Sequence, residues 1–330
     1  MQSFKAFVVS EKDGTFTKTF QTLTTTDLPD GDVTVRIHYS SVNFKDMLAT
    51  QPNNKIIRHY PCIPGIDLAG TVIHSQHPDF HTGDKVIATG YDLGVAHDGG
   101  FSELTRLPGE WLVPLPDNLT LEEAMIIGTA GYTAALSVDA LERNGLSRNE
   151  TPILVRGASG GVGTMATMML HALGYSVVAS SGNTAYADIL TQIGAKDVIP
   201  RIDDITPKAL HKPQWQAVID PVGGDSVEEV LKHIQPFGTM ALSGNTGGAD
   251  FHSTVFPFIL RGVKLIGIDS VYTPMSYRQY IWKRLATDLK PLHLHTVKKV
   301  VSFDELPKEL DAMQQATHHG RIVIDMQAEM

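Results

Sequence analysis

The spacing of apolar and polar residues divides the chain into two parts. Between Phe4 and about Leu115, short β-rich apolar runs such as Val33–Ile37 and Lys85–Ala88 are separated by Gly, Pro, Asp and Asn. Runs of this kind predict strands joined by turns. No long amphipathic helix interrupts them, so we expect a mostly β first domain.

After Pro116, helical and strand patterns alternate. Thr120 precedes the acidic pair Glu122 and Glu123, which suits the positive end of a helix, and an apolar helical stretch follows to about Leu141. Beyond it we expect strands at 153–156, 176–180, 197–199, 217–220, 239–243 and 264–269, with helices at 164–173, 185–193 and 226–234. The alternation predicts an α/β fold in which a parallel sheet is doubly wound, as in Rossmann domains.

A length of 330 residues favours two domains. We place a substrate domain at 1–118 and 299–330 and a Rossmann domain at 119–298. The last segment has a helical pattern at 304–316 and an apolar run at 321–326. We expect it to contain no further strand–helix unit and to return to the first domain as a strand.

A glycine-rich turn joins the first Rossmann strand to the following helix. Residues 157–163 read Gly-Ala-Ser-Gly-Gly-Val-Gly, which fits GxGxxG with Ala158 in the place of the first glycine. Small residues there let backbone amides at a helix N-terminus reach a pyrophosphate, although a glycine stretch can also be only a tight turn. We expect the backbone at Gly160 and Gly161 to reach the phosphates of a dinucleotide, and Gly163 to let the helix pack closely against the strand.

The end of the second Rossmann strand favours NADP over NAD. A carboxylate usually holds the ribose 2′-hydroxyl of NAD about 20 residues after the glycine turn, whereas this chain has Ser181, Gly182 and Asn183. Hydroxyl and amide groups suit a 2′-phosphate, and Arg201 offers a positive charge. The alternative is that Arg201 is an ordinary solvated surface residue.

Composition excludes several classes of protein. The net charge is −9 with scattered Lys and Arg, which argues against a nucleic-acid or anionic-membrane surface. No signal-peptide core or long apolar span is evident, so we expect a cytoplasmic protein. Cys62 is the only cysteine, which rules out a four-cysteine zinc site, and we expect it to pack as a small apolar residue. His293 with His295 and His318 with His319 lack further ligands at useful spacing, so we expect no metal.

Several strings of residues occur together in one family. They are Tyr39–Asp46, Pro64–Gly70, Gly83–Val86, Gly99–Phe101 and Gly128–Ala134. With them the chain resembles the medium-chain dehydrogenases/reductases, and among these the zinc-free, quinone oxidoreductase-like branch. Further strings, at 41–46, 55–58, 63–70, 257–261 and 267–270, resemble the bacterial acryloyl-CoA reductase subgroup.

This resemblance implies a GroES-like first domain and reduction of acryloyl-CoA to propionyl-CoA with NADPH. It implies an NADP site lined by Phe44, Ser159 to Val162, Ser181 to Asn183, Arg201, Asn245, Ile259 and Ser270. The positions that hold zinc in other branches correspond to Asn43, Ile66 with Asp67, and Thr129, which cannot build a tetrahedral site of N and S ligands. Asn183 replaces the subgroup's usual arginine, which weakens the expected preference for NADP. Relatives of this fold usually form homodimers.

The same resemblance directs attention to Asn43 and Asp46 as candidate catalytic residues. Hydride addition to an enoyl thioester makes an enolate, and without a metal its charge must be stabilised by donors such as the Asn43 amide. Asp46 is placed to orient Lys45 or a water, or else it forms a structural contact within the turn. The basic residues Lys55, Arg58 and His59 either meet the phosphates of coenzyme A or lie in an exposed loop. Reduction of quinones or free enones, and non-catalytic NADP binding, are the alternative functions.

Overall fold

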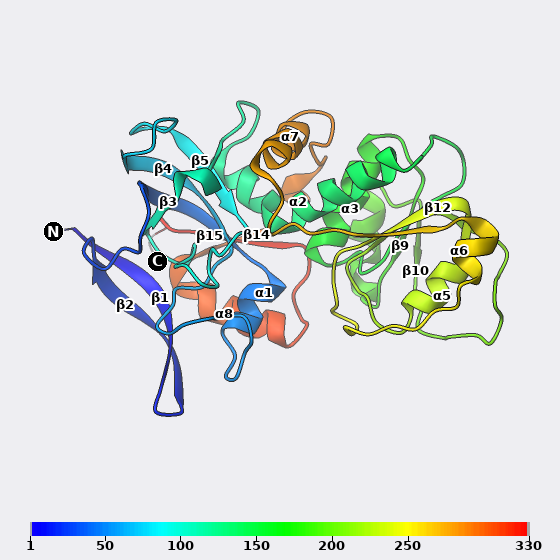
Figure 1. Cartoon of the computed structure of the whole chain (residues 1–330), viewed down its shortest axis with the longest axis horizontal. Helices are drawn as coiled ribbons and strands as arrows, with labels where there is room; N and C mark the ends of the chain where they lie inside the picture. The colour runs from blue at the N-terminus through cyan, green and yellow to red at the C-terminus, as the bar shows by residue number, and fades with distance from the viewer. Residues whose placement is uncertain (1, 329–330) are drawn as a thin grey trace. The chain divides into compact units, whose positions relative to one another are not determined.

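The structure, a computed structural model, describes residues 2–328 and divides into two compact units. Unit 1 comprises Met1–Thr129, Val271–Trp282 and Lys298–Met330, and unit 2 comprises Ala130–Ser270 and Lys283–Val297. Unit 1 contains a two-stranded and a seven-stranded sheet, unit 2 contains a six-stranded sheet, and each unit has a buried core of its own (Figure 1).

Unit 1 is mostly β, as the sequence predicts. β1 (Ser3–Lys12) and β2 (Thr15–Thr24) form an antiparallel hairpin about the Asp13–Gly14 turn, whose residues have φ of 51° and 75°. Positive φ at both central residues is typical of the turns that favour Asp-Gly. Seven more strands form one sheet: β3 (Val33–Val42), β4 (Asp67–Ser75), β5 (Lys85–Thr89), β6 (Leu104–Leu107), β7 (Val113–Pro114), β14 (Lys298–Ser302) and β15 (Arg321–Asp325).

The C-terminal segment completes this sheet. β15 pairs antiparallel with β3, which confirms the predicted return to the first domain as a strand. β14 pairs parallel with β15, and α8 (Leu306–Gln314) connects them, so the prediction that this segment holds no further strand–helix unit is wrong. The sequence did not predict β14 because its five residues begin with two lysines, which obscure the apolar alternation of a strand.

Short helices complete unit 1. They are α1 (Phe44–Ala49), the 3₁₀ turns Gly109–Trp111 and Phe303–Glu305, and most of α7 (Met275–Leu285). Side chains of the sheet, α1 and α8 share one buried cluster that includes Phe7, Leu68 and Leu310, all at most 1% exposed. This cluster holds the end of β3 and the start of α1 in place.

Unit 2 is a doubly wound Rossmann domain, as predicted. Its six parallel strands lie in the order β10-β9-β8-β11-β12-β13, in which the order of strands reverses beside β8. The strands are β8 (Ile153–Val155), β9 (Val177–Ser180), β10 (Asp197–Ile199), β11 (Trp215–Asp220), β12 (Ile234–Leu242) and β13 (Lys264–Gly267).

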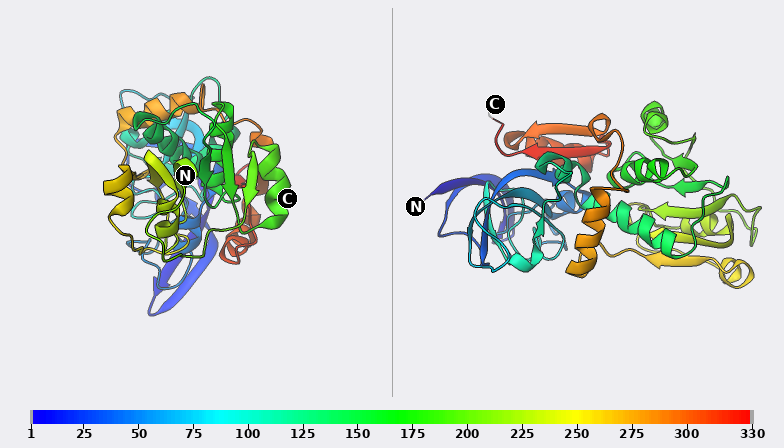
Figure 2. Two further views of the ribbon diagram at one scale, coloured as in Figure 1. Left: turned by 90° about the vertical axis from the view of Figure 1, so that its right-hand side faces the viewer. Right: turned by 90° about the horizontal axis from the view of Figure 1, so that it is seen from above.

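Helices cover both faces of this sheet (Figure 2). They are α3 (Gly161–Ala172), α4 (Ala187–Gln192), α5 (Val227–Lys232) and α6 (Phe256–Arg261), with 3₁₀ turns at Thr184–Tyr186 and Leu294–Thr296. α5 packs its buried side chains, Val227, Val230 and Leu231, against Val218 and Met240 of the sheet. All six parallel strands present their carboxyl ends at one edge, where ligands of such sheets bind.

The boundaries of the units differ from those that we expected at 118/119 and 298/299. Helix α2 (Leu121–Arg143) is interrupted at Gly128, which has φ 50° and ψ −160°, and its first turns belong to unit 1, where the Arg321 Nε donates to the Ile126 carbonyl over 2.7 Å. Part of α7 also belongs to unit 1, because the buried Arg278 donates to the Thr89 carbonyl over 2.8 Å. Neither contact has a local signal in the sequence.

α2 is also the one helix among residues 2–328 that is long and apolar enough to cross a membrane by length and composition. However, 89% of its most apolar 18-residue segment is buried within the protein. Burial of this kind is expected for the core helix of a globular protein.

Candidate functional site

In unit 1, Asn43 and Asp46 lie where β3 ends and α1 begins. Asp46 Oδ2 accepts hydrogen bonds from the Asn43 backbone N–H (2.8 Å) and from Asn43 Nδ2 (3.2 Å), which caps the first turn of α1. Asp46 Oδ1 accepts the Ile66 backbone N–H over 2.9 Å. Asp46 is 1% exposed, so its carboxyl group is held by the turn and does not point into solvent.

Asp67, fully buried on β4, is the centre of the polar cluster around Asn43. Its Oδ2 accepts Ser41 Oγ at 2.6 Å, Asn43 Nδ2 at 2.8 Å and the Thr129 backbone N–H at 2.9 Å, while its Oδ1 accepts Thr129 Oγ1 at 2.5 Å. Four donors on one carboxylate compensate for much of its desolvation. The structure therefore brings together Asn43, Asp67 and Thr129, three of the positions that correspond to zinc ligands in other branches.

Arg321 supplies the positive charge of this cluster. It opens β15, is 2% exposed and lies with Nη2 3.9 Å from Asp67 Oδ2. Its Nη1 donates to Asn43 Oδ1 (3.3 Å) and its Nη2 donates to Ser41 Oγ (2.9 Å). Sequence reasoning did not identify Arg321, although an arginine at the start of the apolar run Ile322–Ile324 is a signal that a buried strand carries a paired charge.

The cluster shifts the proton affinity of its members. Burial raises the pKa of Asp46 to about 7, and the negative charge of Asp67 adds to this effect, while hydrogen bonds from Asn43 and Ile66 oppose it. Burial lowers the pKa of Arg321, and the carboxylates of Asp67 and Asp46 oppose that shift. A carboxyl group with a pKa near 7 can hold or release a proton at neutral pH.

Gly128 is required by this cluster. A Cβ at position 128 would lie 2.5 Å from Asp67 Oδ2, 2.6 Å from Arg321 Nη2 and 2.7 Å from Ser41 Oγ. Its φ of 50° is also one that other residues rarely adopt. The interruption of α2 thus brings the Thr129 amide to Asp67.

In unit 2, the glycine-rich turn joins β8 to α3 as predicted. Gly157 has φ 55°, the Ala158 N–H donates to the Ser180 carbonyl over 3.0 Å, and Gly160 is the N-cap of α3. A Cβ at Gly163 would lie 2.4 Å from the Gly157 oxygen, so α3 packs against the turn through a residue without a side chain. The first amides of α3 at Gly161 and Val162 form the positive end of a helix dipole and suit a phosphate.

The residues expected to distinguish NADP from NAD gather at the end of β9. Ser181 Oγ donates to Ser159 Oγ over 3.0 Å and accepts the Asn183 N–H over 3.0 Å. A Cβ at Gly182 would lie 2.4 Å from Arg201 Nε, so the guanidinium group lies directly against Gly182. This neighbourhood offers hydroxyl, amide and guanidinium donors and has no carboxylate at positions 180–183.

The other four residues expected at the cofactor site do not all lie at one place in the structure. Asn245 and Ser270 follow the carboxyl ends of β12 and β13, the same edge of the sheet as the glycine turn. Ile259, 69% exposed, lies on α6, whose end contacts the amino end of β12 through the bond from Arg261 Nη1 to the Ile234 carbonyl (2.9 Å). The structure therefore does not bring Ile259 to that edge of unit 2. Phe44, in unit 1, is the first residue of α1 and is 40% exposed.

Lys55, Arg58 and His59 lie in a loop of unit 1. Arg58 Nη1 is 3.5 Å from Asp92 Oδ1, and His59 Nε2 is 2.6 Å from the Ala96 carbonyl. Lys55 is exposed. Two of the three groups thus have partners within unit 1, which leaves Lys55 as the side chain most available to an anionic ligand.

Cys62 packs as expected. It is 1% exposed in a small apolar cluster with Ala49 and Ile57. Burial raises the pKa of its thiol to about 12, with a contribution from Asp98. The thiol therefore stays protonated and unreactive at neutral pH.

A cavity of about 530 Å³ in unit 2 lies away from the glycine turn. It is lined by residues around the amino end of β9, including Tyr175, Val177 and Lys196. The glycine turn lies at the opposite, carboxyl edge of the parallel sheet, so this cavity is not part of the candidate site.

Two family models match the chain, and their positions agree with the two folds. The alcohol dehydrogenase GroES-like domain matches residues 29–117, and the zinc-binding dehydrogenase model matches residues 161–287. Together they cover strands β3 to β7 of unit 1 and five of the six Rossmann strands of unit 2.

Individual relatives match nearly the whole chain. The putative quinone oxidoreductase YhfP of Bacillus subtilis is 52% identical over 93% of this chain and 94% of its own length. The probable acrylyl-CoA reductase AcuI of Escherichia coli is 43% identical over 97% and 99%. The structure of YhfP with NAD bound superposes with a TM-score of 0.96 at 49% identity, covering 99% of this chain and 100% of that one. The yhdH oxidoreductase of Salmonella enterica in complex with NADP superposes with a TM-score of 0.94 at 42% identity, covering 98% and 100%. The chain belongs to the medium-chain dehydrogenase/reductase family, in its quinone oxidoreductase-like subgroup with the acrylyl-CoA reductases.

Proposed function

We propose that this protein is an NADPH-dependent reductase of activated C=C bonds, and that acryloyl-CoA, reduced to propionyl-CoA, is its substrate. The observation that carries the proposal is the group formed by Ser159, Ser181, Asn183 and Arg201 at the end of β9. It matches the needs of an NADP 2′-phosphate, in a chain 43% identical to an acrylyl-CoA reductase over nearly its full length.

The residues of unit 2 fit a dinucleotide. When bound, NADPH supplies the hydride that is added to the β-carbon of the substrate. The first amides of α3 would hold its pyrophosphate, and Arg201 with the hydroxyls of Ser159 and Ser181 would hold its 2′-phosphate. Asn183 provides a weaker contact than a second guanidinium group, and YhfP has been seen with NAD. We therefore propose a preference for NADPH that depends mainly on Arg201.

The residues of unit 1 do not fit the zinc ion that the family implies. Asn43 Nδ2 and the Thr129 hydroxyl already donate to Asp67, and Arg321 places a fixed positive charge 3.9 Å from that carboxylate. A dication would have to displace these donors and approach a buried guanidinium group. We propose that no zinc ion binds at this cluster and that the reaction there proceeds without one.

In this proposal, donors of the protein stabilise the negative charge that develops on the thioester oxygen. Asn43, 9% exposed, is the candidate to approach the substrate. Asp46 is less exposed than Asn43, and its carboxylate accepts hydrogen bonds from both the backbone N–H and the side-chain amide of Asn43. We therefore assign Asp46 as a positioning residue that orients Asn43. The proton for the α-carbon then comes from solvent, because both Asp46 oxygens accept hydrogen bonds from Asn43 and Ile66 and an amide side chain does not relay a proton.

Two alternatives rest on specific observations. The similarity to YhfP, named a putative quinone oxidoreductase, favours quinones or free enones as substrates. The commitment of Asn43 to its neighbours within unit 1 favours a protein that binds NADP without catalysis.

We also propose that the protein is a cytoplasmic homodimer. β13 is an edge strand of the Rossmann sheet, and edge strands present unpaired backbone groups. Beside it, α6 exposes Leu260 at 64%, and Phe237, 77% exposed, lies next to Gly262. An exposed apolar patch next to a free sheet edge supports association of two copies.

The test is the oxidation of NADPH, and separately of NADH, by the purified protein with acryloyl-CoA, crotonyl-CoA and 1,4-benzoquinone, followed at 340 nm. We expect saturable turnover with acryloyl-CoA and NADPH. Turnover with benzoquinone alone would support the quinone alternative. Tight NADPH binding without turnover of any of the three would support the binding protein.

A further inference from the structure

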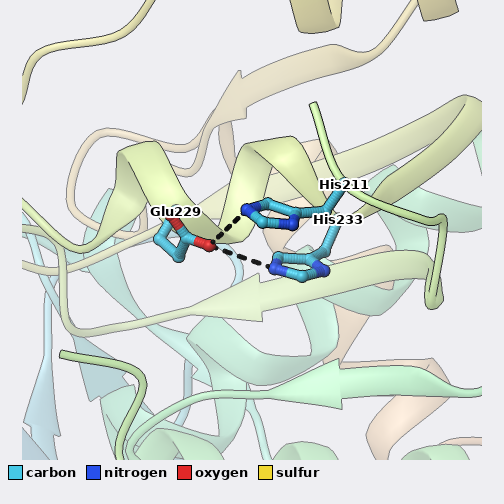
Figure 3. Close-up of side chains that lie close together, drawn as sticks. All are labelled: His211, Glu229 and His233. Carbon is cyan, nitrogen blue, oxygen red and sulfur yellow. Dashed lines mark hydrogen bonds and ion pairs between the residues drawn. The ribbon is translucent and has the colours of Figure 1, made fainter. Parts of the chain in front are cut away.

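Three side chains that commonly bind metals meet in unit 2, away from the glycine turn. The ligand atoms of His211, Glu229 and His233 all lie within 4.8 Å of one another (Figure 3). Glu229 lies on α5, and His233 is the residue directly after the last residue of α5. The two are four positions apart, so their side chains lie on the same side of the helix. His211 comes from segment 200–214, which connects β10 to β11.

The distances suit coordination of one ion. Glu229 Oε1 lies 3.1 Å from His211 Nε2 and 3.2 Å from His233 Nε2. A tetrahedral zinc ion with bonds of about 2.0–2.2 Å separates its ligand atoms by roughly 3.3–3.5 Å. Glu229 Oε1 therefore needs to move away from each nitrogen by only a few tenths of an ångström, and the two nitrogens already lie within 4.8 Å of each other.

The imidazole rings need a further adjustment. They are stacked, with centroids 4.4 Å apart and planes at 3°, and the lone pair of each Nε2 lies in its own ring plane. Parallel planes do not meet at one ion, so at least one ring must tilt. Both side chains are 17% exposed, which leaves their outer edges room to turn.

Neighbouring groups leave the ligand atoms available. Lys232 Nζ lies 3.4 Å from Glu229 Oε2, so the lysine neutralises one carboxylate oxygen and Oε1 faces the histidines. Gln214 Nε2 is placed 3.0 Å from His233 Nδ1, and with its amide turned the oxygen would accept Nδ1–H and leave the Nε2 lone pair for a metal.

Thr206 is a further polar neighbour of the cluster. Its Oγ1 lies 2.6 Å from His211 Nε2 and 3.0 Å from Glu229 Oε2. An ion at Nε2 of His211 would replace the first of these hydrogen bonds and leave the second intact. Thr206 can thus keep Glu229 oriented while the ion binds.

We propose that His211, Glu229 and His233 form a binding site for a divalent transition-metal ion of the zinc class, which fastens segment 200–214 to α5. Two imidazoles and one carboxylate are a known zinc ligand set that leaves a fourth position for water. Mg²⁺ and Ca²⁺ are disfavoured because they require oxygen ligands. The site shares no residue with the Asn43 cluster or the glycine turn.

Calorimetric titration of the chelator-treated full-length protein with Zn²⁺ tests the proposal. We expect one ion per chain, at least tenfold weaker binding in His211→Gln and in His233→Gln, and unchanged binding in His252→Gln, which alters an exposed histidine outside the cluster. Co²⁺ should give the visible absorption of a four-coordinate site in the wild type and lose it in the first two variants.

A second readout follows the segment itself. Lys208 is exposed in segment 200–214, and Zn²⁺ should slow tryptic cleavage after it in the wild type but not in His233→Gln. Circular dichroism checks that each variant is folded, and His211→Gln alters a loop residue whose loss leaves α5 intact. Absence of saturable Zn²⁺ binding, or binding that survives both histidine substitutions, overturns the proposal. Neither result depends on reductase activity, so the proposed function is tested separately.

Discussion

In the polar cluster of unit 1, hydrogen bonds join residues at positions that correspond to zinc ligands in other branches of the family. Asp67 receives donors from Ser41, Asn43 and Thr129, and Arg321 balances its charge. Removing any one partner would leave a buried charge or donor without a hydrogen bond. The free-energy cost of that unsatisfied group is larger than the net stabilisation from the original contact. The residues of the cluster therefore stabilise one another and hold the Asn43 side chain in place.

Asp46 makes the stability of the protein depend on pH. Its pKa is about 7 in the folded state and about 3.8 when unfolded, so the stability from its protonated form is complete below about pH 4 and is lost as pH rises to about 7. This loss approaches about 1.4 kcal/mol per pH unit. We expect Asp46→Asn, which cannot titrate, to flatten the fall in the free energy of unfolding, measured with urea from pH 4.5 to 7.5. The exposed Asp79→Asn is the control, and an unchanged slope in Asp46→Asn would contradict the assignment.

Arg201 carries the proposed preference for NADPH. In Arg201→Gln we expect the KM for NADPH to rise about tenfold, equivalent to about 1.4 kcal/mol, because the phosphate loses a charged partner. The KM for NADH should change less than twofold, since NADH has no 2′-phosphate. Steady-state kinetics with both cofactors measure the ratio. An equal effect on the two would mean that Arg201 supports the loop rather than the phosphate.

At the scale of elements, close packing of α3 against the glycine turn is required for phosphate binding. A Cβ at Gly163 would lie 2.4 Å from the Gly157 oxygen and 2.6 Å from Ala158 Cα, both backbone atoms. We expect Gly163→Ala to displace the start of α3 and to weaken NADPH binding at least tenfold, measured by fluorescence titration. Gly267→Ala is the control, because a Cβ there meets nothing within 4 Å. Equal affinity in the two variants would argue against the turn as the pyrophosphate site.

Elements with a strong local pattern were predictable, and those that depend on distant partners were not. The alternation after Pro116 predicted all six Rossmann strands, whereas their order in the sheet comes from the structure. It missed β14 and the whole of α7, whose positions depend on the pairing of Lys298 with Arg321 and on the bonds of Arg278. The contacts among Ser159, Ser181 and Asn183 follow from the predicted strand–helix units, whereas the contact of Arg321 with Asp67 joins positions 254 apart (321 minus 67). The Glu229–His233 spacing was visible in the sequence, but only the fold adds His211.

At the scale of the whole molecule, the proposed dimer makes a prediction about mass. We expect light scattering to give about twice the chain mass of 35.9 kDa for the wild type. Leu260→Lys places a charge in the exposed patch of α6 and should shift the mass towards one chain. Leu292→Lys, at a 47% exposed leucine outside this patch, should not. A wild type that scatters as a single chain at micromolar concentration would remove the dimer from the proposal.

The burial of Cys62 has a chemical consequence for an enzyme of this proposed activity. Acryloyl thioesters and quinones are electrophiles that alkylate cysteine thiolates, and they would inactivate an enzyme that exposed one near its substrate. Here the only sulfhydryl in the chain is 1% exposed and has a pKa of about 12, so almost none of it is in the reactive form. The protein is thereby protected from covalent damage by the class of compound that it is proposed to consume.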